Sequence, residues 1–280
     1  MRRKLKGASV VITGASSGIG RATALLLAKK GAWLTLVARR EEPLETLRAE
    51  VERSGGRALV VAADVTETEA LKDAARLANA TYGGIDAWVN NAGVFVMGDL
   101  ESTPDDVFHR TMEVNFHAYV YGARAVLPFL RSRGRGVLIN VGSMESRITA
   151  PYATAYASSK FAVRALSKSL RQELRGSGIE VCTVMPPAVD TPLFEHGGNF
   201  AGKKLRPPDP VLSPERIAAA IASCILRPRP EIIGWRHTPD AWLKRGMKAA
   251  LVTGLGSVAV RLIAGRKKRK GLRRFMPAFR

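Results

Sequence analysis

Short apolar runs alternate with longer amphipathic segments along most of this chain, and this alternation restricts its fold more than any other feature. Short apolar runs bounded by turn residues predict buried strands, whereas apolar residues at helical spacing predict helices that cover a sheet. We expect strands at 8–13, 32–38, 58–62, 85–90, 136–142, 179–185 and 231–235. We expect helices at about 18–30, 41–54, 67–81, 104–131, 152–175 and 213–226. This order predicts an α/β, Rossmann-like doubly wound parallel sheet of about seven strands, with helices on both faces.

No Pro-, Ser- or Gly-rich linker interrupts the first 235 residues, so we expect one Rossmann-type domain at 1–235 and a C-terminal extension at 236–280. The net charge of +20 is uneven, because 15 Lys and Arg residues and only two acids lie between Arg227 and Arg280. Apolar residues recur at helical spacing over 247–264, ahead of the basic run GRKKRKGLRRF. A helix of this kind fits an anionic membrane surface, and it fits equally well against the domain or a partner subunit. The longest uncharged run, 249–260, is too short to span a bilayer.

Cysteine and histidine usage indicates a reduced protein without a metal site. Cys182 and Cys224 fall in an expected strand and an expected helix, and neither they nor the four histidines show metal-ligand spacing. The basic N-terminus runs directly into the first expected strand, so we expect no signal peptide. These features predict a cytoplasmic protein, with peripheral membrane attachment through the extension as a second expectation.

A glycine-rich turn, TGASSGIG, follows the first expected strand at residues 13–20. Gly14, Gly18 and Gly20 have the spacing G-x3-G-x-G, and Ser17 and Ile19 belong to the same turn. A turn without side chains lets the backbone approach a pyrophosphate at the N-terminus of the next helix, where free N–H groups and the helix dipole favour anions. A purely structural turn is the alternative, but the position between a strand and a helix favours a dinucleotide site.

The residues after the second expected strand indicate which dinucleotide binds. An NAD site usually has an acid at this point, which hydrogen-bonds the ribose 2′-hydroxyl. This chain has Arg39 and Arg40, and no acid before Glu41. A guanidinium can bind a 2′-phosphate through two hydrogen bonds, whereas a carboxylate would repel it. The sequence therefore predicts NADP(H).

Tyr156 and Lys160 lie four residues apart in the segment YASSK, with Ser143 upstream. On a helix, this spacing places the phenol and the ammonium on one face. A free phenol titrates at about 10, so a tyrosine that exchanges protons near neutrality needs a neighbouring positive charge or hydrogen-bond donors. Lys160 and Ser143 are the expected suppliers and should lower the pKa of Tyr156. Tyr152 could compete as the proton-transfer group, but only Tyr156 has a lysine four residues later.

Five motifs together resemble the short-chain dehydrogenases/reductases, over roughly residues 7–235. They are TGASSGIG at 13–20, NNAG at 90–93, Asn115 in MEVNF, Ser143 in INVGS and YASSK at 156–160. The resemblance implies that Tyr156 is the general acid in carbonyl reduction and the general base in the reverse direction. It also implies that Lys160 holds the nicotinamide ribose, that Ser143 donates a hydrogen bond to the substrate oxygen, and that Asn115 anchors a proton-relaying water.

Further cofactor positions rest on the resemblance alone. It makes Arg39 the stronger of the two arginines and adds a hydroxyl contact from Ser16. The other positions that it implies are Asp64 and Val65 at the adenine, Asn91, Ala92 and Gly93 under the adenine ribose, and Pro186 and Thr191 near the nicotinamide. Pro187 replaces the glycine that the family usually has after Pro186, which puts the local path of the loop in doubt.

The expected function is an NADP(H)-dependent oxidoreductase that interconverts a carbonyl and an alcohol on an apolar small molecule, in a homo-oligomer. The expected substrate wall consists of Phe95, Val96, Met97, Met144, Glu145 and the segment 188–210. One alternative is a regulator that binds the cofactor without turnover. The other is a nucleic-acid-associated protein, because a basic tail binds phosphates nonspecifically. Few aromatic residues lie among the basic ones, so we expect no specific nucleic acid partner.

Overall fold

A parallel sheet of seven strands forms the centre of the protein in a computed structural model, which describes residues 3–202, 209 and 211–233. Its strand order is β3-β2-β1-β4-β6-β7-β9, and every pairing within it is parallel. The strands are β1 (Ser9–Thr13), β2 (Trp33–Ala38), β3 (Arg57–Ala62), β4 (Ala87–Asn90), β6 (Gly136–Val141), β7 (Ile179–Met185) and β9 (Glu231–Ile233). The seven strands expected from the sequence are therefore confirmed, with small shifts at their ends.

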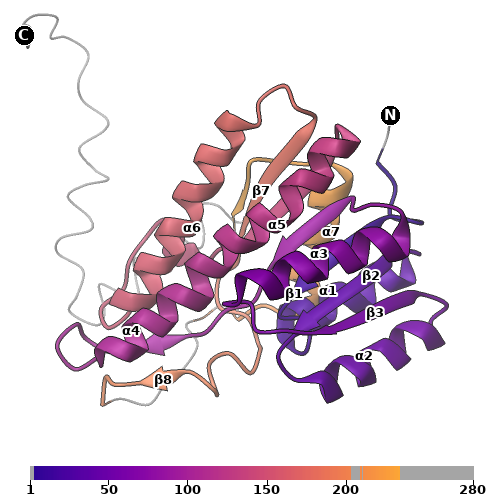
Figure 1. The fold of residues 1–280 in the computed structure, drawn as a ribbon. Coiled ribbons are helices and arrows are strands. Elements are labelled where there is room, and N and C mark those ends of the chain that lie inside the picture. The colour runs from indigo at the N-terminus through magenta and orange to yellow at the C-terminus, as the bar shows by residue number, and fades with distance from the viewer. Residues whose placement is uncertain (1–2, 203–208, 210, 234–280) are drawn as a thin grey trace, which may run out of the picture. The chain divides into compact units, whose positions relative to one another are not determined.

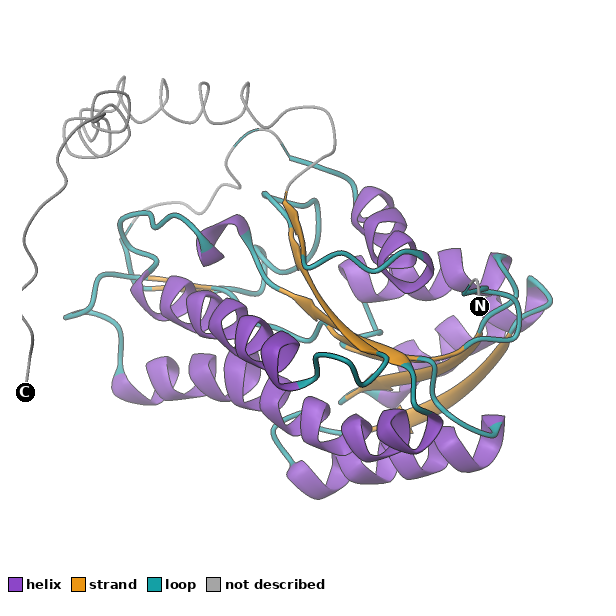
Figure 2. Cartoon of the chain, turned by 90° about the horizontal axis from the view of Figure 1, so that it is seen from above, coloured by secondary structure: helices purple, strands orange, loops and turns teal. Residues whose placement is uncertain are grey.

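Helices cover both faces of this sheet (Figures 1 and 2). One face packs against α1 (Gly18–Lys29), α2 (Glu41–Arg53) and α7 (Pro214–Leu226). The other packs against α3 (Thr68–Tyr82), α5 (Ala118–Arg133) and α6 (Thr154–Glu173), and α4 (Asp105–Met112) lies next to α6. This arrangement confirms the doubly wound fold.

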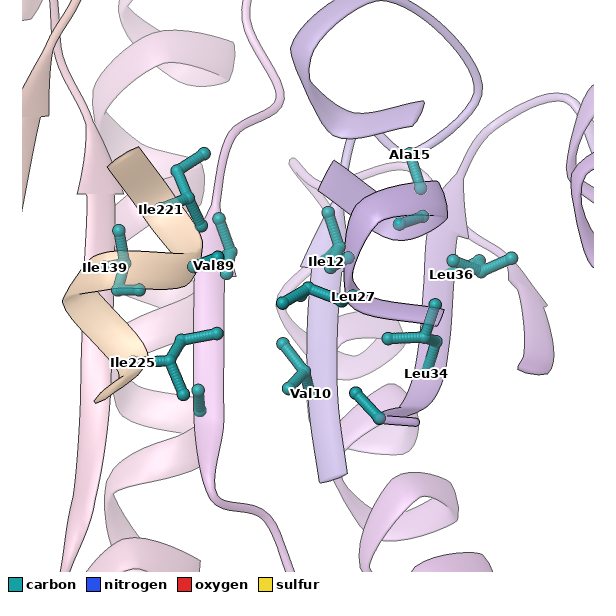
Figure 3. Close-up of a cluster of buried hydrophobic side chains, with 14 of the residues drawn as sticks. Val10, Ile12, Ala15, Leu27, Leu34, Leu36, Val89, Ile139, Ile221 and Ile225 are labelled. Carbon is teal, nitrogen blue, oxygen red and sulfur yellow. The ribbon is translucent and has the colours of Figure 1, made fainter. Parts of the chain in front are cut away.

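The alternation of side chains along β1 explains how both faces are filled. Val10 and Ile12 belong to the core under α1 and α7, whereas Val11 between them belongs to the core on the opposite face, as the two-residue period of a strand requires. Figure 3 shows Ile221 and Ile225 of α7 against the strands that carry Val89 and Ile139, and Leu27 of α1 beside β1. These side chains are buried, so they hold α1 and α7 against this face of the sheet.

Four short elements differ from the sequence prediction. The single helix expected at 104–131 is divided into α4 and α5 by a π-helical turn, η1 (Glu113–His117). A 3₁₀ turn, η2 (Met144–Ser146), follows β6, and a separate two-stranded sheet joins β5 (Val96–Met97) to β8 (Gly198–Asn199). An apolar pattern cannot reveal a single π turn or strands of two residues, because neither is long enough for its period to repeat.

The described residues all belong to one compact unit, Met1–Gly234. The expected amphipathic segment at 247–264 and the basic run behind it lie outside the described residues. Within the part of the chain that the structure describes, no helix has the length and apolarity needed to cross a membrane.

Candidate active site

The site lies at the carboxyl edge of the sheet, where the strand order reverses between β1 and β4. Thr13 ends β1, and its hydroxyl accepts hydrogen bonds from the backbone N–H of Asn91 (3.0 Å) and of Ala92 (3.2 Å). The Asn91 carboxamide donates to the carbonyls of Thr13 (2.9 Å) and Gly14 (3.2 Å). The turns after β1 and β4 are thereby joined, although they are far apart in the sequence.

The three glycines of the turn after β1 are required by close packing. Gly14 has a φ of 65°, and a Cβ on it would lie 2.7 Å from the Ala92 Cα. A Cβ on Gly20 would overlap the Gly14 carbonyl oxygen. A Cβ on Gly18 would lie 3.0 Å from the Thr191 side chain, so the structure brings Thr191 to this turn.

The N-terminus of α1 fits an anion. Ser17 is its N-cap residue, but no side chain among the described residues caps the helix, and its first turn has no acid. Ser16 and Ile19 are half-buried beside it, whereas Ser17 is exposed. The first N–H groups of a helix have no partner within the helix, so an uncapped N-terminus next to a glycine turn is suited to a pyrophosphate.

Arg39 and Arg40 follow β2 at the same edge and are both exposed. Arg40 is the N-cap residue of α2, and neither guanidinium has an ion pair within the described residues. Arg39 and Arg40, without an ion pair among the described residues, therefore lie at the end of β2, where the sequence predicts a contact with a 2′-phosphate.

Asp64 is placed after β3 and is held by protein contacts. One of its oxygens accepts from the backbone N–H (2.9 Å) and the hydroxyl (2.8 Å) of Thr66, and the other accepts from Arg110 of α4 at 2.8 Å. Burial raises the pKa of Asp64, but the hydrogen bonds from Thr66 and Arg110 outweigh it and leave this pKa below its ordinary value. Arg110 was missed in the sequence analysis, since no local pattern connects it with Asp64. Val65 is buried next to this carboxylate.

Tyr156 and Lys160 project from the first half of α6 and are both buried, with exposed fractions of 8% and 4%. The Lys160 ammonium donates to the Val141 carbonyl at 3.2 Å and lies 5.7 Å from the centre of the Tyr156 ring. It also lies 5.3 Å from the centre of the Tyr119 ring, whose hydroxyl donates to the same carbonyl. The predicted pairing of phenol and ammonium on one helix face is thus present, with Tyr119 as a third member that the sequence did not reveal.

Ser143 follows β6 and caps the turn η2. Its hydroxyl accepts from the Glu145 N–H at 3.1 Å, and its own N–H donates to Ser146 Oγ at 3.1 Å. The next N–H in the turn, that of Met144, donates to the Pro186 carbonyl at 2.8 Å, which ties the turn to the end of β7. The Ser143 side chain is also close enough to the Tyr156 phenol to lower its pKa. Ser143, Tyr156 and Lys160 are therefore brought together.

The pKa of Tyr156 differs from the expectation that Lys160 lowers it. Burial raises this pKa, the nearby Glu145 carboxylate raises it further, and the hydrogen bond with Ser143 opposes both effects. Lys160 does not reverse this, because its ammonium is buried as well and bonds to a carbonyl instead of the phenol. Burial lowers the pKa of Lys160 from 10.5 to about 8.

Asn115 lies fully buried within the π-helical turn η1. Its carboxamide accepts from the Val94 N–H (2.8 Å) and donates to the Val94 carbonyl (3.0 Å) and to Ser159 Oγ (3.1 Å). A Cβ on Gly93 would lie 3.2 Å from the Asn115 Oδ1 and 3.7 Å from the Lys160 Nζ. Asn115 and Lys160 thus flank the turn after β4.

Aromatic side chains form a wall beside Tyr156. The Phe95 ring packs edge-on against the Tyr156 ring, with centres 4.9 Å apart, and its centre is also 4.9 Å from that of Phe194. Phe194 lies in the segment 188–210, which the sequence predicts as a binding loop, but nothing in the local pattern singles it out.

Tyr152 does not share the helix with Tyr156, because α6 begins at Thr154. It has a φ of 65°, and its carbonyl accepts from the Gly98 N–H at 2.7 Å. Tyr152 is therefore part of the turn that leads into α6, and the four-residue spacing does not stack it under Tyr156.

Comparison with known proteins establishes the family. A model described as short chain dehydrogenase matches residues 8–199. The chain belongs to the short chain dehydrogenase family. Relatives of this short chain dehydrogenase are named as oxidoreductases. No group of three or more His, Cys, Asp or Glu residues that could hold a metal ion occurs in the described part of it.

Two relatives and one solved structure show the extent of the likeness. This short chain dehydrogenase is 37% identical over 231 residues to an uncharacterized oxidoreductase, YxnA, of Bacillus subtilis, covering 81% of this chain and 65% of that protein. It is 38% identical over 196 residues to the 3-dehydrosphinganine reductase of Danio rerio, covering 68% and 59%. The chain thus matches less than two thirds of the length of both relatives. A metagenomic short-chain oxidoreductase, solved in complex with NADP, matches with a TM-score of 0.71 at 29% identity, over 82% of this chain and 97% of that one.

Proposed function

We propose that this short chain dehydrogenase is an NADP(H)-dependent oxidoreductase that interconverts a carbonyl and an alcohol, with Tyr156 as the general acid and base. The observation that carries the proposal is the convergence of Ser143, Tyr156 and Lys160 at the edge of the sheet where the glycine turn opens. Membership of the family supports the same reaction class.

The residues present fit a nicotinamide dinucleotide. The glycine turn and the uncapped N-terminus of α1 would hold the pyrophosphate, the turn at 91–93 would lie under the adenine ribose, and Thr191 beside Gly18 would contact the nicotinamide. When bound, the cofactor supplies or accepts the hydride. The end of β2 supports NADP(H) over NAD(H), because Arg39 and Arg40 are exposed and unpaired within the described residues, and a solved neighbour carries NADP.

The residues of this chain would move the proton. Burial holds the Tyr156 phenol in its protonated form near neutral pH, which suits it to donate a proton to a carbonyl oxygen. Ser143 would donate a hydrogen bond to the same oxygen and stabilise the charge that develops there. Lys160, with its pKa lowered to about 8, and Asn115 would connect the phenol with solvent.

An apolar substrate is supported by the wall beside Tyr156. Phe95 packs against the phenol and Phe194 packs against Phe95. Val96 and Met97 follow Phe95 in the chain and form β5. A relative that matches this chain over 196 residues is named as a reductase of 3-dehydrosphinganine. We infer that the substrate is a ketone or alcohol with a substantial apolar part.

The direct test uses purified protein with NADPH and a panel of ketones, aldehydes and steroid or acyl carbonyls, with NADPH oxidation as the readout. Tyr156→Phe should fold and bind NADPH but lose turnover by roughly two to four decades, the usual size of a general acid–base contribution. Tyr121→Phe, which removes a phenol from α5, is the matched control and should keep the rate. If the protein binds NADPH but turns over no compound of the panel, this proposal is wrong and the alternative, a regulator that binds the cofactor without turnover, takes its place.

We also propose that the protein is a cytoplasmic homo-oligomer that attaches to anionic membranes through 247–280. The positive charge of that segment, which lies outside the described residues, supports the attachment to anionic membranes. Co-sedimentation with anionic and neutral liposomes at low and high salt tests the attachment, and gel filtration with light scattering tests the assembly. Protein that stays in the supernatant with both liposomes would overturn the membrane proposal.

A further inference from the structure

Glu145 lies next to the proposed catalytic groups Ser143 and Tyr156. Its Oε2 is shielded from solvent and has no hydrogen-bond partner among the described residues. The nearest cation along the chain, Arg147, lies 3.7 Å from Glu231 instead. Burial raises the pKa of Glu145 to about 7, so near neutral pH this carboxyl exists in both forms.

The position of Glu145 is set by the same turn that holds Ser143. Its backbone N–H donates to the Ser143 hydroxyl at 3.1 Å, and its carboxylate is close enough to Tyr156 to raise the pKa of the phenol. The residue as a whole is half-buried, so a ligand would reach the shielded Oε2 by rotation of the partly exposed side chain. The aromatic side of the site, Phe95 and Phe194, has no polar atom to offer.

A buried carboxyl oxygen without a donor is unfavourable, because it has lost its water and gained nothing in return. Native structures leave few such groups, and those near a functional site call for a ligand as the missing partner. An apolar side chain at this position would fill the same space without that cost. The missing donor is therefore expected on the substrate itself.

We propose that Glu145 binds a hydrogen-bond donor, a hydroxyl or a protonated amine, that the substrate carries on a carbon near its reacting carbonyl. This inference rests on the proposed carbonyl–alcohol reaction and adds one polar anchor to an otherwise apolar substrate. A hydroxyl can bond to either form of the carboxyl, whereas a protonated amine needs the carboxylate. Glu145 is then a specificity-determining residue that orients the carbonyl toward Ser143 and Tyr156.

The test compares three straight-chain ketones of equal length: a plain ketone, its α-hydroxy derivative and its α-amino derivative. We expect the wild-type protein to prefer at least one donor-bearing ketone over the plain one by about tenfold or more in kcat/KM, since a site that pairs a polar group discriminates strongly against a ligand that lacks it. In Glu145→Leu this ratio should fall to near one, mainly through KM. Glu145→Gln should keep a preference for the hydroxyl but lose that for the amine.

Glu173→Gln, on the exposed end of α6, is the matched control and should keep the wild-type ratios. If Glu145→Leu keeps NADPH binding and the wild-type ratio of kcat/KM between donor-bearing and plain ketones, the inference about Glu145 is wrong. Turnover of the plain ketone tests the proposed function separately. If no ketone is turned over, the proposed function fails. In that case, calorimetry with the α-amino and α-hydroxy ketones on NADPH-loaded protein tests whether Glu145 binds the donor group. Equal affinities for the wild type and Glu145→Leu would exclude this role of Glu145.

Discussion

At the residue scale, the unpaired arginines after β2 should decide the choice of cofactor. Arg39→Ala should weaken NADPH binding by roughly ten- to a hundredfold and leave NADH binding almost unchanged, because one charge-assisted hydrogen bond to the 2′-phosphate is lost. Fluorescence titration with both cofactors measures this. Arg53→Ala removes an equal charge from the other end of α2 and should have little effect. Equal losses for NADPH and NADH in Arg39→Ala would contradict the assignment.

The buried charge of Lys160 should lower the free energy of unfolding, compared with an uncharged side chain at the same position. Its folded-state pKa of about 8 lies below the ordinary value of 10.5, so between these values the unfolded chain binds more protons, and the free energy of unfolding rises with pH. Lys160→Met removes the buried charge and should raise that free energy by about 1 to 3 kcal/mol near pH 7. The gain should shrink as the pH rises through this window.

Urea unfolding at several pH values measures the effect of Lys160→Met. Lys168→Met, which changes an exposed lysine on the same helix, should show no such pH dependence. A variant at position 160 that is less stable than the wild type near pH 7 would show that the hydrogen bond to Val141 outweighs the cost of burial.

At the scale of elements, the pair β5–β8 holds the loop that carries Phe194 against the site. Gly98 lies just after β5, where its N–H donates to the Tyr152 carbonyl, and a Cβ on it would overlap Thr103 Oγ1 and lie 2.8 Å from the Phe200 Cβ. Gly98→Val should therefore separate the two strands and raise KM for the carbonyl substrate several-fold, with NADPH affinity kept because the glycine turn lies on other strands. Steady-state kinetics and NADPH titration measure both. Leu100→Ala, an exposed neighbour, is the control, and a parallel loss of NADPH binding would refute the assignment.

At the scale of the whole molecule, Glu231 fastens the last strand of the sheet to α6. It lies 2.8 Å and 3.2 Å from Arg164, 3.7 Å from Arg147 and 3.9 Å from Arg171. The hydrogen bond from Arg164 is the main reason that the pKa of Glu231 lies below its ordinary value of 4.5. Such a lowered pKa contributes stability above the unfolded-state value, and this stability is lost as the pH falls through the folded-state value.

Glu231→Gln should accordingly lower the free energy of unfolding by about 1 to 2 kcal/mol near pH 7. Its difference from the wild type should close as the pH falls below the ordinary value of 4.5. Urea unfolding near pH 7 and below pH 4.5 measures this difference in the free energy of unfolding. Glu180→Gln, which changes an exposed residue, is the control. A difference that is independent of pH would mean that Glu231 acts through packing and not through its charge.

The sequence alone determined the layers of the fold and the motifs at its carboxyl edge. Strand and helix periods record which side chains are buried, so the seven strands, the turn at 13–20 and the placement of Tyr156 and Lys160 on one helix face could be predicted from local pattern. The family followed from the same motifs in order.

Only the tertiary structure decided which distant segments meet and what their burial does. The joining of Gly14 to Asn91, the bond of Arg110 to Asp64 and the contact of Phe194 with Phe95 depend on the path of the chain between them, which no local period records. The directions of the pKa shifts of Tyr156, Lys160 and Glu145 depend on desolvation by residues from several elements. Spacing can place two groups on one helix face, but the surrounding dielectric is a property of the assembled core.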